Sequence, residues 1–290
     1  MANNPNYLSY SKMMAWLKCR KSYDFKYHQG LIPQPSEVSI ETWERFTRGI
    51  LIHGGCEAAF LGETIEQGVA HAKDDVIRRG VDSSKLVLLP DLVKQANEVA
   101  SAAMQYFSPK NWEPVIFNDK PLVEGQLIVP VTGFDGYQGY VDLVAREKST
   151  GMIFVIDYKT RERFEDHGDD IFNMQFATYQ YMLDYHNIDC VGSILFEMKP
   201  KIPKSPGTQM FKLTKTRRSK EYVQNVWNWV DKTAKIMAED KENMYPTMYA
   251  FNCKSCYYKT ICQGEMQGDD VDYIRNELYI SKNSTIKLEG

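Results

Sequence analysis

The sequence GYVDLVAREKSTGMIFVIDYKT, residues 139–160, decides the fold of this chain. It contains two stretches rich in apolar residues, and the turn-forming run KSTG (148–151) separates them, which predicts two antiparallel strands. Each stretch carries a carboxylate among apolar neighbours, Asp142 in the first and Asp157 in the second. Burying an aspartate is costly unless a cation meets it, so these two positions indicate a functional site within the sheet.

The second stretch also carries a lysine two residues after its aspartate. Strand alternation places Asp157 and Lys159 on one face and Tyr158 on the other. Two carboxylates on adjacent strands would be compensated by a divalent metal ion, and hard oxygen ligands suit Mg²⁺ or Mn²⁺. The pattern therefore predicts a metal site at these strands.

Polar residues on two predicted helices could complete this site. His53 lies in RGILIHGG (48–55), where the flanking glycines permit close backbone approach, and a nitrogen ligand would favour Mn²⁺. Gln175 and Tyr179 are spaced i, i+4 and share one helix face. Each feature alone has an ordinary explanation, such as a surface ion pair or a buried core histidine. Their order along helix, strand, strand and helix indicates a catalytic site.

The elements on either side of this stretch predict an α/β fold in one composite domain. Apolar periodicity predicts helices, with Asp91 as the N-cap of the fourth, and alternation predicts strands. The predicted helices cover 8–28, 43–60, 64–79, 91–107, 171–186 and 219–240, and the predicted strands cover 121–131, 136–147, 151–160, 191–198 and 208–216. Residues 31–40 contain prolines and predict a loop, and residues 265–290 form a tail to which the sequence assigns no role.

The six cysteines divide into a cluster and two isolated residues. Three lie in FNCKSCYYKTIC (251–262), a C-x2-C-x5-C run whose thiolates could surround one metal centre. Cys19, on a basic and aromatic predicted helix, is the best candidate for a fourth ligand. Cys56 and Cys190 lie in apolar patterns typical of buried cysteine. The spacing leaves structural zinc and an iron–sulfur cluster both open.

Composition and charge limit the possible functions. The 290 residues carry 35 Lys+Arg against 38 Asp+Glu, a net charge of −3, so any nucleic acid would need a local basic patch. No apolar run is long enough for a transmembrane helix, and the first residues lack the features of a signal peptide. We therefore expect a cytoplasmic protein with no membrane association. No G-x4-G-K-[ST] loop occurs, so the chain is not itself an ATP-driven helicase.

Together these residues resemble the PD-(D/E)XK nuclease superfamily, in particular the RecB-like branch with an iron–sulfur cluster, which includes CRISPR-associated RecB-like exonucleases and the AddB nuclease domain. The resemblance covers about residues 8–263. It rests on the motifs Gly49-x3-His53, Gly139-Tyr140-Val141-Asp142, Asp157-Tyr158-Lys159 and Gln175-x3-Tyr179, and on Cys19 with Cys253, Cys256 and Cys262. It implies a restriction-endonuclease-like αβββαβ core, about residues 43–200, with added N-terminal helices and a C-terminal cysteine clasp formed from 8–28 and 250–264. The composite nuclease domain would then cover 1–264.

The resemblance also implies roles for individual residues. It favours a 4Fe–4S cluster over zinc at the four cysteines. His53, Asp142, Asp157 and the Tyr158 carbonyl would bind Mg²⁺ or Mn²⁺, and Lys159 would position the attacking water. Gln175 and Tyr179 would contact the DNA backbone. Glu124, on the first strand, is a candidate for an outer carboxylate or a ligand of a second ion.

A basic run of eight residues without an acidic one lies between 199 and 220. Its members are Lys199, Lys201, Lys204, Lys212, Lys215, Arg217, Arg218 and Lys220. A solvated surface loop would explain it, but beside a nuclease site it predicts phosphate contacts. A second basic group on residues 18–26 is interleaved with aromatics such as Trp16, Tyr23 and Phe25, for which base stacking and core packing are both possible.

These observations predict a metal-dependent DNA nuclease, more specifically an exonuclease acting on single strands or DNA ends. A helicase or recombination protein is a possible partner. The alternatives are a non-catalytic DNA-binding or adaptor protein with the same fold, and a zinc-clasped protein of unrelated function.

Overall fold

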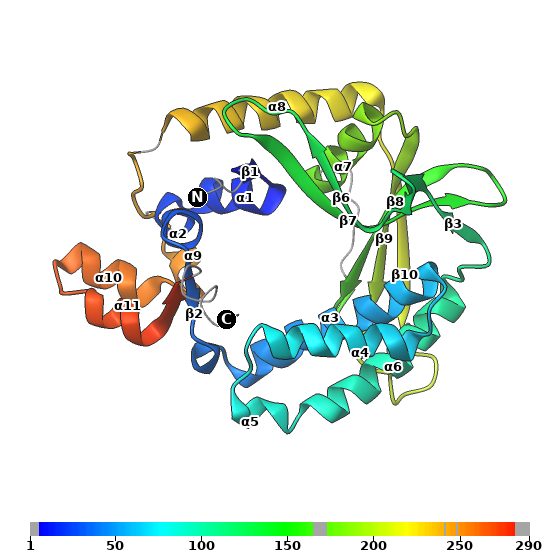
Figure 1. Ribbon diagram of the computed structural model, residues 1–290, viewed down its shortest axis with the longest axis horizontal. Helices are drawn as coiled ribbons and strands as arrows, with labels where there is room; N and C mark the ends of the chain where they lie inside the picture. The colour runs from blue at the N-terminus through cyan, green and yellow to red at the C-terminus, as the bar shows by residue number, and fades with distance from the viewer. Residues whose placement is uncertain (1–5, 165–172, 241, 248, 282–290) are drawn as a thin grey trace. The chain divides into compact units, whose positions relative to one another are not determined.

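The computed structural model describes residues 6–164, 173–240, 242–247 and 249–281 (Figure 1). The chain divides into two compact units. The first contains Met1–Ser39, Pro130–Tyr137 and Val230–Gly290, and the second contains Ile40–Val129 and Gln138–Trp229. The expected core of about 43–200 lies in the second unit except for 130–137, and the expected single domain over 1–264 stays a prediction.

A mixed sheet forms the centre of the second unit. Its strands are β6 (Val123–Val129), β7 (Gly136–Glu147), β8 (Ile153–Thr160), β9 (Cys190–Met198) and β10 (Phe211–Arg217). β7 runs antiparallel to β8 and also pairs with β6, whereas β8 runs parallel to β9, and β10 is antiparallel to β9. A parallel pair needs a crossover, and α7 (Met174–Tyr185) lies in the connection between β8 and β9.

Short strands extend this sheet or lie beside it. β1 (Tyr7–Leu8) pairs in parallel with the first residues of β7, and all of these residues belong to the first unit. β3 (Trp112–Pro114) is antiparallel to the end of β7. β4 (Ile116–Phe117) and β5 (Lys120–Pro121) pair with each other.

Helices cover one face of the sheet, as Figure 1 shows. They are α3 (Ile40–Leu61) and α6 (Leu89–Tyr106), and α4 (Ile65–Arg78) packs on α3. The short α5 (Ser83–Leu86) lies in the connection between α4 and α6. Alternate residues of β8, Phe154, Ile156 and Tyr158, pack into the same apolar core as α3, α4 and α6. The opposite alternation, which includes Asp157, therefore points away from this core. The mixed α/β architecture agrees with the predicted fold class, and the chain order α3, β6, β7, β8, α7, β9 contains the predicted αβββαβ core.

The first unit is built from short elements at both ends of the chain. They are α1 (Tyr10–Lys18), α2 (Arg20–Tyr23), the π-helix η1 (Asp24–His28), β2 (Leu31–Pro33), the 3-10 helix η2 (Pro35–Glu37), α9 (Ala250–Cys253), α10 (Lys259–Gln267), α11 (Asp272–Leu278) and β11 (Tyr279–Ser281). A small core contains Phe25, Leu31, Tyr258, Ile261 and Tyr279. α8 (Lys220–Glu239) connects the second unit to the first.

Several sequence predictions need correction. The predicted helix over 8–28 is interrupted at Cys19, whose backbone is extended (φ −165°, ψ 111°). Asp91 is not an N-cap, because α6 begins at Leu89 and Asp91 lies in its first turn. A carboxylate in that position still interacts favourably with the helix dipole. The predicted loop over 31–40 contains β2, which pairs with β11 in the tail that had no assigned role.

Most strand predictions are confirmed, because β6, β7, β8, β9 and β10 lie within or coincide with the predicted ranges to within one residue. None of the described helices has the length and apolarity that a membrane span requires.

Candidate active site

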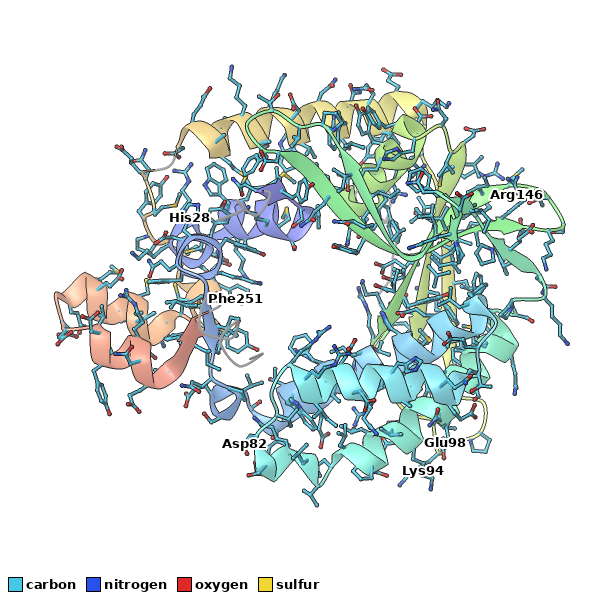
Figure 2. All side chains as sticks on the ribbon, viewed as in Figure 1. His28, Asp82, Lys94, Glu98, Arg146 and Phe251 are labelled. Carbon is cyan, nitrogen blue, oxygen red and sulfur yellow. The ribbon has the colours of Figure 1, made fainter. Side chains whose placement is uncertain are left out.

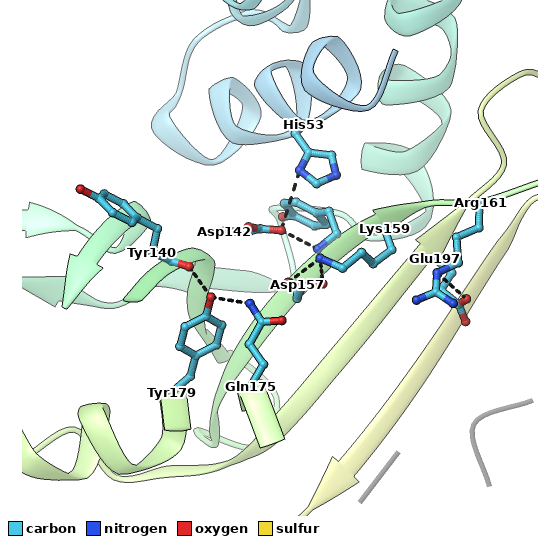
Figure 3. Close-up of polar contacts among 10 residues, drawn as sticks. His53, Tyr140, Asp142, Asp157, Lys159, Arg161, Gln175, Tyr179 and Glu197 are labelled. Atoms are coloured by element: carbon cyan, nitrogen blue, oxygen red, sulfur yellow. Dashed lines mark hydrogen bonds and ion pairs between the residues drawn. The ribbon is translucent and has the colours of Figure 1, made fainter. Parts of the chain in front are cut away.

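Four of the predicted site residues converge in the second unit (Figure 3). They are His53, Asp142, Asp157 and Lys159. β7 and β8 carry the two aspartates, and α3 carries His53 above them. Nδ1 of His53 lies 3.8 Å from Oδ2 of Asp142. The same oxygen accepts a hydrogen bond of 2.7 Å from the backbone N–H of Tyr158, which ties β7 to β8 at this point.

Asp157 and Lys159 form a close ion pair. The Lys159 Nζ atom lies 2.7 Å and 2.9 Å from the two carboxylate oxygens of Asp157. Only 7% of the Asp157 side chain is exposed, compared with 41% for Lys159. The pair therefore has a buried anionic end and a solvent-facing cationic end, which suits contact with a phosphate group.

Burial makes both aspartates weak acids in the metal-free protein. Desolvation raises the pKa of Asp142 to about 6, although Lys159 and the Tyr158 N–H oppose this shift. Desolvation and the nearby Asp142 raise the pKa of Asp157 to about 6. Burial alone would lower the pKa of Lys159, but the two aspartates outweigh it and the pKa is raised. The site thus holds more negative charge than its surroundings stabilise, and a cation would relieve this excess.

His53 is neutral at physiological pH. Burial and the neighbouring Lys159 lower its pKa to about 4. Its ring packs edge-on against Tyr158, with ring centroids 5.8 Å apart. A neutral imidazole has the free nitrogen lone pair that a metal ligand needs.

Glu57 is a site residue that the sequence reasoning missed. Burial, together with charge and hydrogen bonding from Glu124, raises its pKa to about 9. Glu124 has a left-handed backbone (φ 47°), which is uncommon for a residue other than glycine. Asp142 also contributes to the shift, so three carboxyl groups are electrostatically linked. The i, i+4 spacing of His53 and Glu57 on one helix could have indicated this position.

Arg161 and Glu197 form another pair beside the site (Figure 3). Arg161 Nε lies 3.6 Å from Glu197 Oε1, and Glu197 is fully buried. The strand register places Glu197 directly beside Lys159. The charge of Arg161 acts against the raised pKa of Lys159, so this pair influences the lysine electrostatically.

Gln175 and Tyr179 form one hydrogen-bonded chain with β7. The Gln175 amide donates to the Tyr179 hydroxyl (2.8 Å), which donates to the carbonyl of Tyr140 (2.7 Å). Gly139 makes this contact possible, because a Cβ atom there would lie 2.8 Å from the Tyr179 ring. The Gly-Tyr-Val-Asp strand is therefore fixed by α7, two residues before Asp142.

The donor set fits a hard divalent ion, although no preformed metal cage is present. Among the residues that the structure describes, no group of three or more His, Cys, Asp or Glu side chains is already arranged as a metal site. Asp142, Asp157 and His53 nevertheless supply two carboxylates and one neutral imidazole at one place, with too little positive charge around them. This chemistry suits Mg²⁺ or Mn²⁺.

The four clustered cysteines all lie in the first unit, although among the described residues they are not already arranged as a metal site. Burial raises the pKa of Cys262, and charge from Cys19, Cys256 and Cys253 raises it further, so all four thiols lie within electrostatic reach. Cys19 Sγ accepts a hydrogen bond of 3.4 Å from the Thr247 N–H. Thiolates that lie near one another repel, so holding all four deprotonated would need a cation. Cys56 is fully buried, as predicted, whereas Cys190, also predicted to be buried, is only partly buried because it lies at the start of β9.

The predicted basic run does not form one surface. The register places Lys212 level with Lys159 across Glu197, whereas Arg217 lies at the opposite end of the sheet beside Gly192. Arg218 is buried and donates to Ser193 Oγ (2.7 Å), which places its guanidinium in the interior.

Other members of the run also have local partners. Lys215 lies 3.3 Å from a Glu147 carboxylate oxygen, and Lys220 lies 3.4 Å from one of Asp184. Lys199 donates to the carbonyl of Glu162. Lys201 and Lys204, in the loop between β9 and β10, remain exposed.

The aromatics that precede and follow Cys19 are core residues. Trp16, Tyr23 and Phe25 are buried, so core packing, and not base stacking, explains them.

Comparison with known proteins gives a family match and distant structural neighbours. The solved structures that resemble the chain include SSO0001 (15% identity, TM-score 0.37, covering 90% of this chain and 88% of that one) and a protein from Eubacterium rectale described as “Putative exonuclease” (11% identity, TM-score 0.46, covering 86% and 93%). No curated protein matches the chain. The family model of the PD-(D/E)XK nuclease superfamily matches residues 7–263, a range that contains all of the site motifs. This chain therefore belongs to the PD-(D/E)XK nuclease superfamily.

Proposed function

We propose that this protein is a cytoplasmic, metal-dependent DNA exonuclease of the RecB-like type that acts on single strands or DNA ends. The observation that carries the proposal is the charge imbalance at Asp157, which is buried, and Asp142, which is partly buried; both carboxyl groups have raised pKa values beside a lysine and a neutral histidine. Burying ionised carboxylates lowers stability, and a divalent cation bound for hydrolysis would offset their charge.

The site residues would have different roles in phosphodiester hydrolysis. Asp142, Asp157, His53 and the Tyr158 carbonyl would hold Mg²⁺ or Mn²⁺. The chemistry that such an ion supplies when bound is a lower pKa of water and stabilisation of charge on the phosphate. Glu57 and Glu124, whose carboxyl groups interact, would retain a proton between them and add an outer acidic group.

Lys159 would bring positive charge to the scissile phosphate and orient the attacking water. Its ammonium is anchored by Asp157 and its exposed end faces solvent, so it can meet the substrate without losing its position. An ammonium group already fixed in place stabilises developing negative charge without reorganisation.

Gln175 and Tyr179 would contact the DNA backbone near the scissile bond. The hydrogen bond from Tyr179 to the Tyr140 carbonyl links that contact to the strand that carries Asp142. Lys199, Lys201, Lys204 and Lys212 are the members of the basic run that could continue the phosphate path, since they lie in or beside the loop at the same sheet end as Lys159.

In the first unit, Cys19, Cys253, Cys256 and Cys262 would hold a 4Fe–4S cluster. The proposal is supported by the electrostatic influence of Cys19, Cys253 and Cys256 on the Cys262 thiol. Its role would be structural, because the cluster would link residue 19 to residues 253–262 across most of the chain.

The test is a cleavage assay with added Mg²⁺ or Mn²⁺ on 5′- and 3′-labelled linear single strands, linear duplexes and covalently closed circular single strands. An exonuclease degrades the linear forms and leaves the circles intact. Asp157→Ala should abolish cleavage while the exposed control Asp189→Asn should not. If the wild-type protein with its cluster intact cuts no DNA form with either metal, the proposal is wrong. DNA binding without cleavage would then indicate the non-catalytic alternative.

A further inference from the structure

Exposed aromatic residues stand next to the clustered cysteines in the sequence of the first unit. Tyr249, Phe251 and Tyr257 are 64%, 73% and 52% exposed. The rings of Tyr249 and Phe251 lie 6.0 Å apart, and Phe251 is marked on α9 in Figure 2. We call these three residues together with Lys254 the aromatic–lysine surface. Leaving several large rings in water forfeits hydrophobic stabilisation, and clustered exposed rings mark interaction sites.

The chain segment that carries these rings has basic but no acidic residues. No Asp or Glu occurs between residues 249 and 264, whereas Lys254 and Lys259 are exposed. The Asn252 amide donates to the carbonyl of Lys18 (3.4 Å), so the backbone of another exposed lysine lies beside α9. A ligand complementary to this segment would carry flat apolar groups that stack on the rings and negative charges that pair with the ammonium groups.

The backbone under these rings is held in place. Tyr279 donates a hydrogen bond to the Tyr257 carbonyl (2.8 Å), and the next residue, Tyr258, is buried and donates to the Leu31 carbonyl (2.9 Å). The Asn252 N–H donates to the Tyr249 carbonyl (3.0 Å). The exposed rings therefore stand on a fixed support and lose little freedom when they bind.

We propose that the aromatic–lysine surface binds single-stranded nucleic acid, with bases stacked on Tyr249, Phe251 and Tyr257 and phosphates near Lys254. In a duplex the base faces are already stacked on one another, so the rings select an unpaired strand. Lysine is depleted from protein–protein interfaces, which favours a polyanion over a protein partner. The inference rests on the proposed function in so far as the bound strand is also the nuclease substrate.

The test measures binding and needs no cleavage. Fluorescence anisotropy with labelled oligothymidylate is recorded on full-length, cluster-containing Asp157→Ala protein without added divalent metal. Tyr249→Ala and Phe251→Ala should each weaken binding about tenfold, since stacking contributes about 1–3 kcal/mol per base. Phe251→Trp should retain binding, because it keeps a stacking face. Tyr273→Ala, which removes an equally exposed ring (72%) on α11, is the matched control and should change nothing.

Two further probes identify the chemistry. An abasic oligonucleotide of the same length keeps the phosphates and lacks the bases, so its affinity should not change in Phe251→Ala. Lys254→Ala should reduce the salt slope of oligothymidylate binding by about 0.7, as expected for one lost phosphate contact. Unchanged oligothymidylate affinity in Phe251→Ala, or an equal loss in Tyr273→Ala, overturns the inference.

The outcome is separable from that of the proposed function. Normal cleavage together with unchanged binding in the ring variants rejects only the aromatic–lysine surface. Absent cleavage in the wild-type protein together with ring-dependent binding rejects only the nuclease proposal.

Discussion

Replacing Asp142 by asparagine should stabilise the metal-free protein. The substitution keeps the shape of the side chain and an oxygen that can accept the 2.7 Å hydrogen bond from the Tyr158 N–H. It removes a partly buried charge whose folded-state pKa is raised from 3.8 to about 6, mainly by desolvation. At 1.36 kcal/mol per pKa unit, the ionised carboxylate costs about 3 kcal/mol, so Asp142→Asn should raise the free energy of unfolding by up to that amount at pH 8.

The pH dependence follows from the sign of the shift. A carboxyl whose pKa is raised by folding contributes stability below its unfolded pKa, and this contribution is lost as pH rises through the folded value. The advantage of the asparagine variant should therefore be complete above about pH 7 and disappear by about pH 4, where the wild-type carboxyl is protonated. Urea denaturation followed by circular dichroism across this range, without divalent metal, measures it. Asp189→Asn at an exposed position should change stability by less than about 0.5 kcal/mol at any pH.

Added Mn²⁺ should reverse the order of stabilities. An ion that binds only the folded state stabilises it by RT ln(1 + [L]/Kd), about 2.7 kcal/mol at one hundred times Kd. The wild-type protein should gain this increment and Asp142→Asn should gain much less. The reasoning is refuted if the metal-free variant is less stable than wild type at pH 8, or if the difference between them does not change with pH.

The remaining predictions concern the lysine, the tyrosine link and the cluster. Lys159→Ala should lower the cleavage rate at least about a hundredfold, since it removes preorganised positive charge, and a rate within threefold of wild type contradicts its role. Tyr179→Phe should cost about 1–3 kcal/mol of stability in urea denaturation, because it leaves the Tyr140 carbonyl without its donor. Gly139→Ala should reduce both activity and melting temperature, since its Cβ would lie 2.8 Å from the Tyr179 ring, and an unchanged melting temperature counts against this contact. Cys19→Ser should lose iron and the visible absorbance near 400 nm, and an unchanged iron content would exclude Cys19 as a ligand.

The strands and part of the site could be predicted because a single local rule determines them. Alternation in FVIDYKT separates Asp157 and Lys159 from Tyr158, and the structure places Tyr158 in the core and the other two in an ion pair. A buried strand allows few arrangements, so period-2 reasoning is reliable there. Glu57 was missed because α3 has several polar positions; its i, i+4 spacing from His53 is a weak signal, and the tertiary contact with Glu124 is what distinguishes it.

Predictions failed where contacts distant in sequence decide the outcome. Arg218 lies in a run of surface-type residues, yet Ser193 and Gln180 provide buried partners for its guanidinium. β2 and β11 are strands of three residues each, separated by more than 240 positions, and neither is long enough to show alternation. Cys19 is extended in the middle of a helix-forming sequence, and its sulfur accepts a hydrogen bond from Thr247.

The short helices and small core of the first unit offer a physical reason for the proposed cysteine cluster. α2 and α9 are four residues long, below the length at which a helix is stable by itself, and they flank the cluster ligands. The apolar core beside them, as far as the structure describes it, consists of five buried side chains, with Cys256 and Cys262 packed at its edge. So small a core offsets little of the entropy of ordering segments from both ends of the chain. Four metal–thiolate bonds at this point would supply the missing stabilisation, and they would hold the Tyr249 and Phe251 rings on a rigid support. The same cluster would then explain both the stability of the first unit and the fixed geometry of the surface proposed to bind a single strand.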